Sequence, residues 1–425
     1  MERALMQNTY HDKLLLYRNF RPREDAPPEY KIREEEGSQD MRYLWEFQCA
    51  LTEGRNVSCM AFNNEQKDML AVGYGQFEFS QQTEGMVAFW SLKNPEYPAW
   101  TFSSPSGVTA LSFSTSSPEI LAVGFYNGMV AIYDVRQPTE KPTPIMESGH
   151  TSGKHSDPVW KLRWVPAGPD RGEALVSIST DGRITQWTIK KGLEFQDLIK
   201  LKRVANRRLP PQKKDGESGG VAVKTEAFIS RRSSGLCFDF SPRDPSIYIA
   251  GTEDGLIHKC SCSYSEQYLT SYPGHGGPVY QVQWSPFKHD LFLSASADWT
   301  VKLWSDESEQ ALLTFQSGND KVADLQWSPT SSTVFSTVST DGRVEVWDLS
   351  QSTLKPVLAH TLESHKLSTV LFSVASPILV AGSHNGAVSV FRLVGVEKPE
   401  SNPAEQLAVL EEAMAANIIS NKRGN

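Results

Sequence analysis

One pattern, two strands of alternating polarity joined by a polar turn, recurs seven times along this 425-residue sequence. Two of the copies read LFLSASADWTVKLW from Leu291 and VFSTVSTDGRVEVW from Val334. The register of the seven copies is marked by their turn residues, Glu84, Asn127, Asp181, Asp254, Asp298, Asp341 and Asn385. Successive marks are 43, 54, 73, 44, 43 and 44 residues apart, which gives a base period of 43 to 44 residues. A four-stranded propeller blade has this period, so the sequence predicts an all-β fold, a seven-bladed β-propeller.

The strand that closes the ring is expected before the first complete copy. One blade cannot bury both of its faces, so blades stack in a ring that must close or leave an exposed edge strand. The segment LWEFQ, from Leu44 to Gln48, is expected to supply the outer strand of the last blade. We predict three regions: a helical or extended N-terminal segment at 1–43, the propeller at 44–395, and a C-terminal amphipathic helix at 396–425.

Both flanking segments contain helical patterns. Residues 1–20 place four apolar or aromatic side chains on one stripe, namely Met6, Tyr10, Leu14 and Tyr17. Asn402-Pro403 provides a helix cap and a first helical residue, and the stripe that follows is Leu407, Leu410, Met414 and Ile418. This second stripe fits either packing on the propeller or binding of another chain, and we expect packing on the propeller.

Composition narrows the classes of function. The hydrophobic share of 39% and the charged share of 22% are those of a folded chain. A net charge of -8 disfavours binding to nucleic acid by charge alone, and no apolar run approaches the roughly 18 residues of a membrane span. The N-terminus has no continuous apolar segment and there are only five cysteines, so we expect the cytosol or a compartment continuous with it.

Histidine, aspartate and tryptophan recur at fixed places in several copies. These residues are His155, Asp181 and Trp187 in the third copy, His275, Ser294, Asp298 and Trp304 in the fifth, and Asp341 and Trp347 in the sixth. They resemble the WD-repeat family, in which such side chains form a buried hydrogen-bonded relay from loop to strand. His275, Ser294 and Asp298 also have the residue types of a hydrolase triad, but a triad occurs once, whereas this set recurs with the repeat. We therefore interpret the set as structural and predict no catalytic residue.

The sequence patterns that could indicate a metal or nucleotide site are weak. Cys260 and Cys262 share a strand face, but no second pair lies at metal-ligand spacing, so no metal site is predicted. No GxxxxGK[ST] sequence occurs, and we predict no cofactor. Cys260, Tyr133 and Phe391 stand near the tryptophan position in the fourth, second and seventh copies, where we expect apolar packing in place of the relay.

Six aromatic residues are candidates for binding a protein partner. Tyr74, Phe77 and Phe79 fall in a turn extension that is otherwise polar, YGQFEFSQQTEG. The other three, at strand entries or turns near one face of the propeller, are Trp160, Tyr280 and Trp299.

A basic insert interrupts the period between the third and fourth copies, at residues 190–233. From Lys190 to Ser234 it contains twelve Lys or Arg and five acidic residues. Its first part, Leu193 to Val204, alternates like an outer strand. Three interpretations stay open for the rest: a solvated loop, a surface for an acidic partner or tubulin, and phosphorylation at Ser233 or Ser234.

Longer stretches are more specific than the repeat. The segments AVGYGQFEFSQQTEGMVAFWSLKNPEYP, FSSPSGVTALSF, GKHSDPVWKLRW and SSTVFSTVSTDGRVEVWDL resemble the dynein intermediate chains, and the axonemal branch more than the cytoplasmic one. Within that branch the sequence is similar to the intermediate chain of the two-headed inner-arm dynein, type I1 or f. Family members usually carry a long N-terminal region that binds light chains, whereas this sequence starts close to the propeller, so the resemblance does not extend light-chain binding to these residues.

The resemblance implies a non-catalytic subunit of the ciliary or flagellar axoneme, assembled in the cytoplasm. Its propeller is expected to bind the N-terminal tail of a dynein heavy chain, beside a second intermediate chain and other axonemal dynein subunits. The alternative is a generic WD-repeat adaptor in ciliary transport or in preassembly of dynein arms. An enzyme built on a propeller is a third class, and it would need a metal or several carboxylates converging on the axis.

Overall fold

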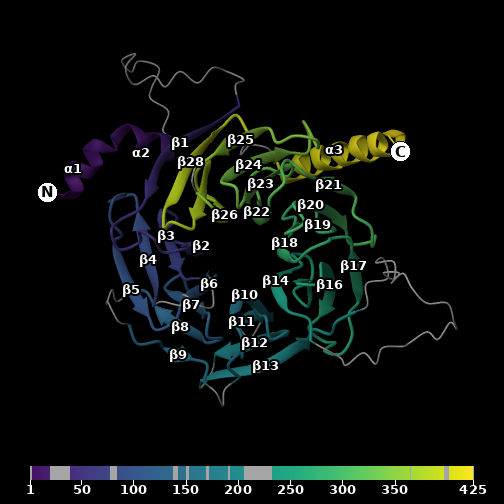
Figure 1. The fold of residues 1–425 in the computed structure, drawn as a ribbon, viewed down its shortest axis with the longest axis horizontal. Coiled ribbons are helices and arrows are strands. Elements are labelled where there is room, and N and C mark those ends of the chain that lie inside the picture. Colours follow the sequence, from purple (N-terminus) through teal and green to yellow (C-terminus); the bar gives the residue numbers. More distant parts are fainter. Residues whose placement is uncertain are drawn as a thin grey trace, which may run out of the picture.

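The computed structural model describes residues 2–19, 39–76, 84–136, 142–149, 153–168, 172–189, 192–204, 232–363, 365–396 and 402–424. Its strands form seven four-stranded antiparallel sheets arranged as blades around a central axis (Figure 1). The seven-bladed propeller predicted from the 43-to-44-residue period is therefore confirmed. In every blade the strand order follows the chain from the inner strand outward, except in the blade that closes the ring.

The blades are numbered from the first complete copy. Blade one contains β2 (Val57–Phe62), β3 (Met69–Tyr74), β4 (Gly85–Ser91) and β5 (Trp100–Ser104). Blade two contains β6 (Val108–Phe113), β7 (Ile120–Phe125), β8 (Val130–Asp134) and β9 (Met146–Glu147). Blade three contains β10 (Val159–Gly168), β11 (Gly172–Ser179), β12 (Arg183–Ile189) and β13 (Leu193–Lys200). Blade four contains β14 (Gly235–Phe240), β15 (Ile247–Thr252), β16 (Leu256–Ser261) and β17 (Thr270–Pro273).

The remaining three blades follow the same plan. Blade five contains β18 (Val279–Trp284), β19 (Leu291–Ser296), β20 (Val301–Ser305) and β21 (Leu313–Phe315). Blade six contains β22 (Val322–Trp327), β23 (Val334–Ser339), β24 (Arg343–Asp348) and β25 (Leu358–Thr361). Blade seven contains β26 (Leu367–Phe372), β27 (Ile378–Ser383), β28 (Val388–Val394) and β1 (Asp40–Phe47).

The ring closes through the two ends of the chain. β1 runs antiparallel to β28, with Asp40 opposite Val394 and Phe47 opposite Val388. The expected closure by an N-terminal outer strand is confirmed, although the strand begins four residues earlier than the LWEFQ segment. Leu44 and Trp45 are only 2% and 3% exposed, so their burial stabilises the closure.

Apolar clusters between neighbouring blades form the core. Successive side chains of a strand point to opposite faces of its sheet, and each sheet packs between two neighbouring sheets, so both faces contribute buried side chains. Four tryptophans at strand ends are among the largest fully buried side chains, namely Trp90, Trp187, Trp304 and Trp347. In blades two, four and seven the corresponding residues Tyr133, Cys260 and Phe391 are also buried, as expected for packing without an indole.

Two short helices precede the propeller in place of the single helix expected over residues 1–20. α1 (Glu2–Thr9) and α2 (His11–Tyr17) are separated at Tyr10. The ring of Tyr17 stacks on Trp45 at a centroid distance of 5.6 Å. Arg392, from β28, donates to the backbone oxygen of Leu16 at 2.8 Å, which fixes the end of α2 to blade seven.

The C-terminal helix α3 (Pro403–Gly424) packs against blades five and six at the edge of the disc (Figure 1). Leu410 and Met414 of the predicted stripe are buried there with Phe315 and Trp347. The Ser332 hydroxyl also donates to the backbone oxygen of Gln406 at 2.6 Å. The expectation that α3 packs on its own propeller is confirmed.

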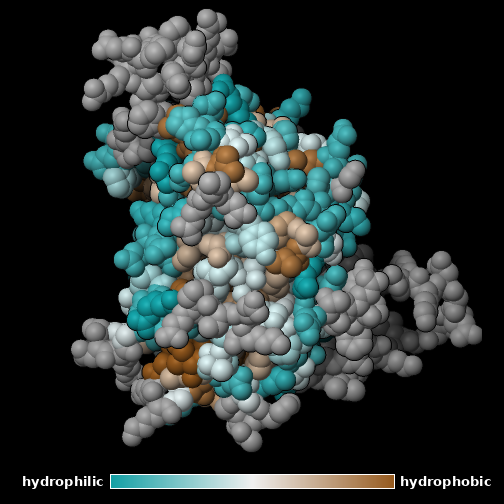
Figure 2. Space-filling model, turned by 90° about the vertical axis from the view of Figure 1, so that its left-hand side faces the viewer, coloured by the Kyte–Doolittle hydropathy of each residue, from teal (hydrophilic) through white to brown (hydrophobic). Residues whose placement is uncertain are grey.

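The rim of the disc offers a contrast to this buried interior. Figure 2 looks at the rim on the side of blade one, where hydrophilic side chains prevail and apolar ones form small separate areas.

Candidate partner-binding face

One flat face of the propeller, the turn face, contains the turns between the second and third strands and the chain segments that enter the inner strands. In each blade a backbone N–H of the turn donates to the oxygen of the residue just before the inner strand. Examples are Glu253 to Ser234 at 3.0 Å and Ala297 to Pro278 at 2.9 Å. The same bond in seven blades places equivalent residues on one ring around the axis, so a residue type at a given turn position predicts where its side chain lies.

Two histidine relays support this face from below. In blade three, Asp181 Oδ2 lies 3.0 Å from His155 Nδ1, and His155 Nε2 lies 2.7 Å from Ser177 Oγ. The indole N–H of Trp187 donates to the same hydroxyl oxygen at 2.8 Å.

Blade five repeats this geometry. Asp298 Oδ2 lies 2.9 Å from His275 Nδ1, His275 Nε2 lies 2.7 Å from Ser294 Oγ, and Trp304 donates to Ser294 Oγ at 2.8 Å. Each serine hydroxyl bonds both a ring nitrogen and an indole N–H, and is therefore occupied by the relay. This arrangement stabilises the turn, and it leaves the serine no geometry for attack on a substrate.

Burial and hydrogen bonding set the protonation states of the aspartate and histidine in the relay of blade five. Burial alone raises the pKa of Asp298, but hydrogen bonds from His275, Thr300 and the Gly276 N–H outweigh it and hold the pKa well below the usual range. Burial lowers the pKa of His275, against the opposing effect of Asp298. The pair therefore consists of a carboxylate and a neutral imidazole near pH 7.

Blade six does not contain a third relay of this kind. The sequence placed Asp341 and Trp347 in one, but Asp341 instead accepts from Arg343 Nε at 2.6 Å. Arg343 also donates to Glu345, whose other carboxylate oxygen accepts from Ser317 at 2.7 Å. An ionic cluster takes the place of the histidine, while Trp347 packs in the core.

Tyr74 lies in the core and not in a binding loop. The sequence pattern ended the strand before this residue, but β3 continues and Tyr74 pairs with Met86 of β4. Tyr74 is 1% exposed, and its hydroxyl accepts from the indole N–H of Trp90 at 3.3 Å. The prediction that Tyr74 contacts a partner is therefore wrong. Phe77 and Phe79 lie outside the described residues.

The three other aromatic candidates all lie on the turn face. Trp160 and Tyr280 are the second residues of the inner strands β10 and β18 and are half-buried. The indole N–H of Trp160 donates to Thr180 Oγ1 at 2.7 Å. Trp299, in the turn of blade five, is 45% exposed.

A polar network across the axis was not found by sequence reasoning. Lys161 of blade three bonds Gln281 of blade five, whose amide donates to Asp324 of blade six at 2.8 Å. Asp324 also accepts from Thr369 of blade seven at 2.9 Å. Burial lowers the pKa of Lys161 and raises that of Asp324, while each charge partly offsets the effect on the other. The network joins four blades near the axis.

The described part of the basic insert is mostly engaged with the propeller. β13 confirms the outer strand expected from Leu193, and residues 205–231 lie outside the described residues. Arg203 forms an ion pair with Asp254. Ser233 is 3% exposed and donates to Asp254 at 2.6 Å, so the structure disfavours its phosphorylation, whereas Ser234 is half-buried.

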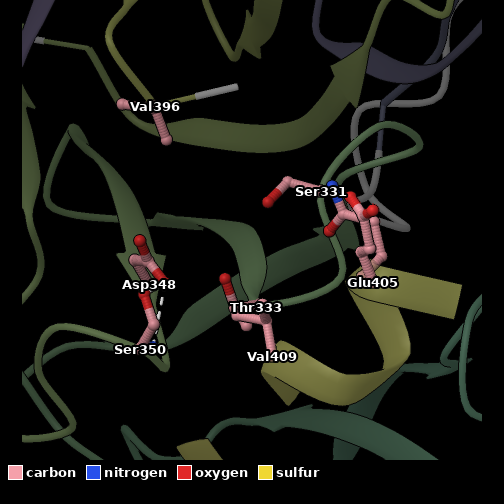
Figure 3. A pocket seen from close by; sticks show the side chains of 8 residues that line it. Ser331, Thr333, Asp348, Ser350, Val396, Glu405 and Val409 are labelled. Atoms are coloured by element: carbon pink, nitrogen blue, oxygen red, sulfur yellow. Dashed lines mark hydrogen bonds between the residues drawn. The ribbon is translucent and has the colours of Figure 1, made fainter. Parts of the chain in front are cut away.

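A small hollow lies away from the turn face, between α3 and blade six (Figure 3). Its volume is about 120 Å³, well below the roughly 300 Å³ at which ligand pockets begin. Asp348 lies in its wall and accepts from Ser350 Oγ at 2.7 Å, so this carboxylate is already satisfied.

The described residues contain no group of three or more His, Cys, Asp or Glu side chains placed to hold a metal ion. No described helix has the length and apolar character needed to cross a membrane.

The closed ring of seven blades with histidine–aspartate relays is the structure of a WD-repeat propeller. The sequence matches the family described as the dynein axonemal intermediate chain 3 WD40 domain over residues 78–163 and 259–391, just over half of the chain. The chain belongs to the axonemal dynein intermediate chains.

Individual relatives agree with this family. The chain is 42% identical to dynein axonemal intermediate chain 4 of Rattus norvegicus, over 96% of this chain and 55% of that protein. It is 43% identical to the Homo sapiens chain 4, over 92% of this chain and 49% of that protein. For dynein axonemal intermediate chain 1 of Rattus norvegicus the identity is 38%, over 72% and 40% of the two chains. The chain thus spans about half the length of these relatives.

A solved structure shares the fold alone. The computationally designed Ika8 protein superposes with a TM-score of 0.50 at 20% identity, over 79% of this chain and 83% of the designed one.

Proposed function

We propose that this chain is a non-catalytic intermediate chain whose propeller binds the N-terminal tail of a dynein heavy chain. In this role it scaffolds, anchors or regulates an inner-arm dynein of the ciliary or flagellar axoneme, after assembly in the cytoplasm. The observation that carries the proposal is the identity of 42% with an axonemal intermediate chain across 96% of this chain, blades and connecting turns together.

The structure supports a binding role in physical terms. A closed disc held by inter-blade packing is rigid, so its turn face presents side chains at fixed positions at little entropic cost on binding. Trp160, Tyr280 and Trp299 give that face aromatic anchors of the kind that dominate protein interfaces. A helix of a heavy-chain tail laid across such a face would bury its apolar side against them.

Further partners are proposed with the same status. A second intermediate chain and other axonemal dynein subunits are expected in the same complex. The basic insert is a candidate contact with tubulin, whose surface is acidic, through residues 205–231, because the described bases Lys202 and Arg203 already bond the propeller.

Co-purification tests the proposal directly. The tagged chain is co-expressed with the N-terminal tail of an axonemal dynein heavy chain and analysed by size-exclusion chromatography with light scattering. We expect a stoichiometric complex with the tail, and no complex with the motor domain lacking the tail. Separate elution of a folded chain and a folded tail would refute the proposal.

A further inference from the structure

Blade five departs from the other described turns at one backbone position. The residue after the turn acid or amide is a glycine with φ between 78° and 92° in five blades, namely Gly128, Gly182, Gly255, Gly342 and Gly386. In blade five the residue is Trp299, with φ of 71°. A bulky L-residue rarely adopts this conformation, because its Cβ crowds the backbone. The chain therefore holds a large ring, 45% exposed, where a glycine would fit without strain.

A second irregularity concerns the inner strands around the axis. All seven shift register at their second residue, which leaves that residue as a bulge on the turn face. In blades seven, one and two the bulge residue is Ser368, Ser58 or Thr109, and its hydroxyl donates to a backbone oxygen of the next blade. These three residues fasten neighbouring blades together.

In blades three, four and five the bulge residue is large instead. These residues are Trp160, Leu236 and Tyr280, each half-buried on three consecutive blades. Together with Trp299 they form what we call the apolar arc. Blade six has only Ala323 at this place, so the arc occupies one side of the face.

Two lysines continue the ring beyond the arc. Lys321 and Lys366 precede the inner strands of blades six and seven, at the position that is uncharged in the other five blades. Both are exposed, and neither forms an ion pair with a described residue. The nearby Asp320 directs its carboxylate to the Thr340 hydroxyl at 2.8 Å. The turn acid Asp341 of blade six pairs with Arg343. The two lysines therefore add to blades six and seven two exposed cations that have no ionic partner among the described residues.

We propose that the apolar arc and the lysine pair form one docking surface for a protein segment that carries apolar side chains beside carboxylates. The aromatic rings supply anchors that lose water on binding, and the lysines attract and orient the acidic part. This inference rests on the function proposed above, under which the segment belongs to the heavy-chain tail. Trp299 is the anchor that the fold holds in a strained turn.

The first test separates the ring of Trp299 from its backbone strain. Binding of the purified heavy-chain tail is measured for Trp299→Ala and Trp299→Gly, with Tyr264→Ala as control because Tyr264 is 63% exposed on the opposite face. Both Trp299 variants should weaken binding roughly tenfold or more, whereas the control should bind normally. The Gly variant should melt about 1–2 °C above the Ala variant, since only glycine relieves the positive φ.

The second test addresses the chemistry of the segment. Lys321→Glu combined with Lys366→Glu is compared with Lys67→Glu combined with Lys355→Glu, which makes the same charge change at exposed positions on the opposite face. The first pair should weaken tail binding roughly tenfold and flatten its dependence on salt, and the second pair should change it little.

The outcomes distinguish this inference from the proposed function. Tail binding that is equal in the wild type and in all variants would leave the proposed function standing and overturn the docking surface. Tighter binding by the Lys321 and Lys366 double variant would overturn the acidic character of the segment. A wild-type chain that does not bind the tail would overturn both proposals. A Trp299→Gly variant that melts more than about 5 °C below the wild type while binding the tail normally would show that the ring serves the fold.

Discussion

The relay of blade five predicts a large effect from the loss of a single oxygen atom. Ser294 is fully buried, and its hydroxyl both accepts from the indole of Trp304 at 2.8 Å and bonds His275 at 2.7 Å. Ser294→Ala removes this oxygen and leaves two buried polar groups without a partner. At about 1–3 kcal/mol for each unsatisfied group, we expect the variant to lose about 3 kcal/mol of unfolding free energy.

A matched control is present in the neighbouring blade. Ser336 on β23 is also fully buried, but its hydroxyl has no hydrogen-bond partner among the described residues. Ser336→Ala removes the same atom from an equally buried site without breaking a bond. We therefore expect this variant to be as stable as the wild type or more stable, by up to about 1 kcal/mol.

Urea unfolding followed by tryptophan fluorescence measures both changes. With an m-value of about 4 kcal/mol/M, extended from the range for smaller proteins, a loss of 3 kcal/mol lowers the midpoint by about 0.8 M. A double-mutant cycle with His275→Ala then assigns the cause, since Ser294→Ala should cost much less when the imidazole is already absent. Equal midpoints for the Ser294 and Ser336 variants, or additive effects in the cycle, would refute the relay as the source of stability.

Two further predictions concern other parts of the fold. Burial lowers the pKa of His258 to about 4, whereas an unfolded histidine titrates near 6.5, so stability should be complete above pH 6.5 and fall by up to roughly 3 kcal/mol as the pH decreases to 4. In urea titrations at several pH values, His258→Phe should reduce this fall in stability, whereas His11→Gln, at an exposed position, should not. Identical pH profiles for the wild type and both variants would contradict the reasoning. Leu410→Ala, at a fully buried position of α3, should cost about 2–4 kcal/mol in thermal unfolding, and Val409→Ala, 43% exposed, less than about 0.5 kcal/mol. Similar losses for both would mean that α3 does not pack as described.

The fold was predictable because every copy of the repeat contains the same sequence signals for its strands and turn. Each copy contains the same alternation and the same turn, so an uncertain strand in one blade is corrected by six others. The relays of blades three and five were predictable from the resemblance to the WD-repeat family, because these two copies contain the histidine, aspartate and tryptophan of that family's relay. Blade six shows the limit of this argument: it keeps Asp341 and Trp347 without a histidine, and Arg343 takes the carboxylate.

The residues of the proposed binding face and of the channel around the axis were predicted less completely. Tyr74 was misplaced because a glycine beside it suggested a turn, while the pairing of Tyr74 with Met86 extends the hairpin. The network of Lys161, Gln281 and Asp324 was missed because its members come from blades that are distant along the chain. Polar residues at alternate strand positions have no local signature when their partners lie across the axis.

Trp299 is a different case from Tyr74 and the axial network. The sequence identified it as a candidate for partner binding, and it occupies a turn position that holds a glycine in five other blades. The turn acid before it, the relay below it and the strands on either side all agree with the repeat, so the departure is confined to one residue. A chain whose local preferences otherwise support one fold has no structural need for a strained aromatic in a turn. Strain of this kind persists when the side chain contributes elsewhere, and under the docking surface proposed above that contribution comes from contact with a partner. The contrast between Trp299→Ala and Trp299→Gly is informative for this reason: the two variants remove the same ring, and only one of them removes the strain.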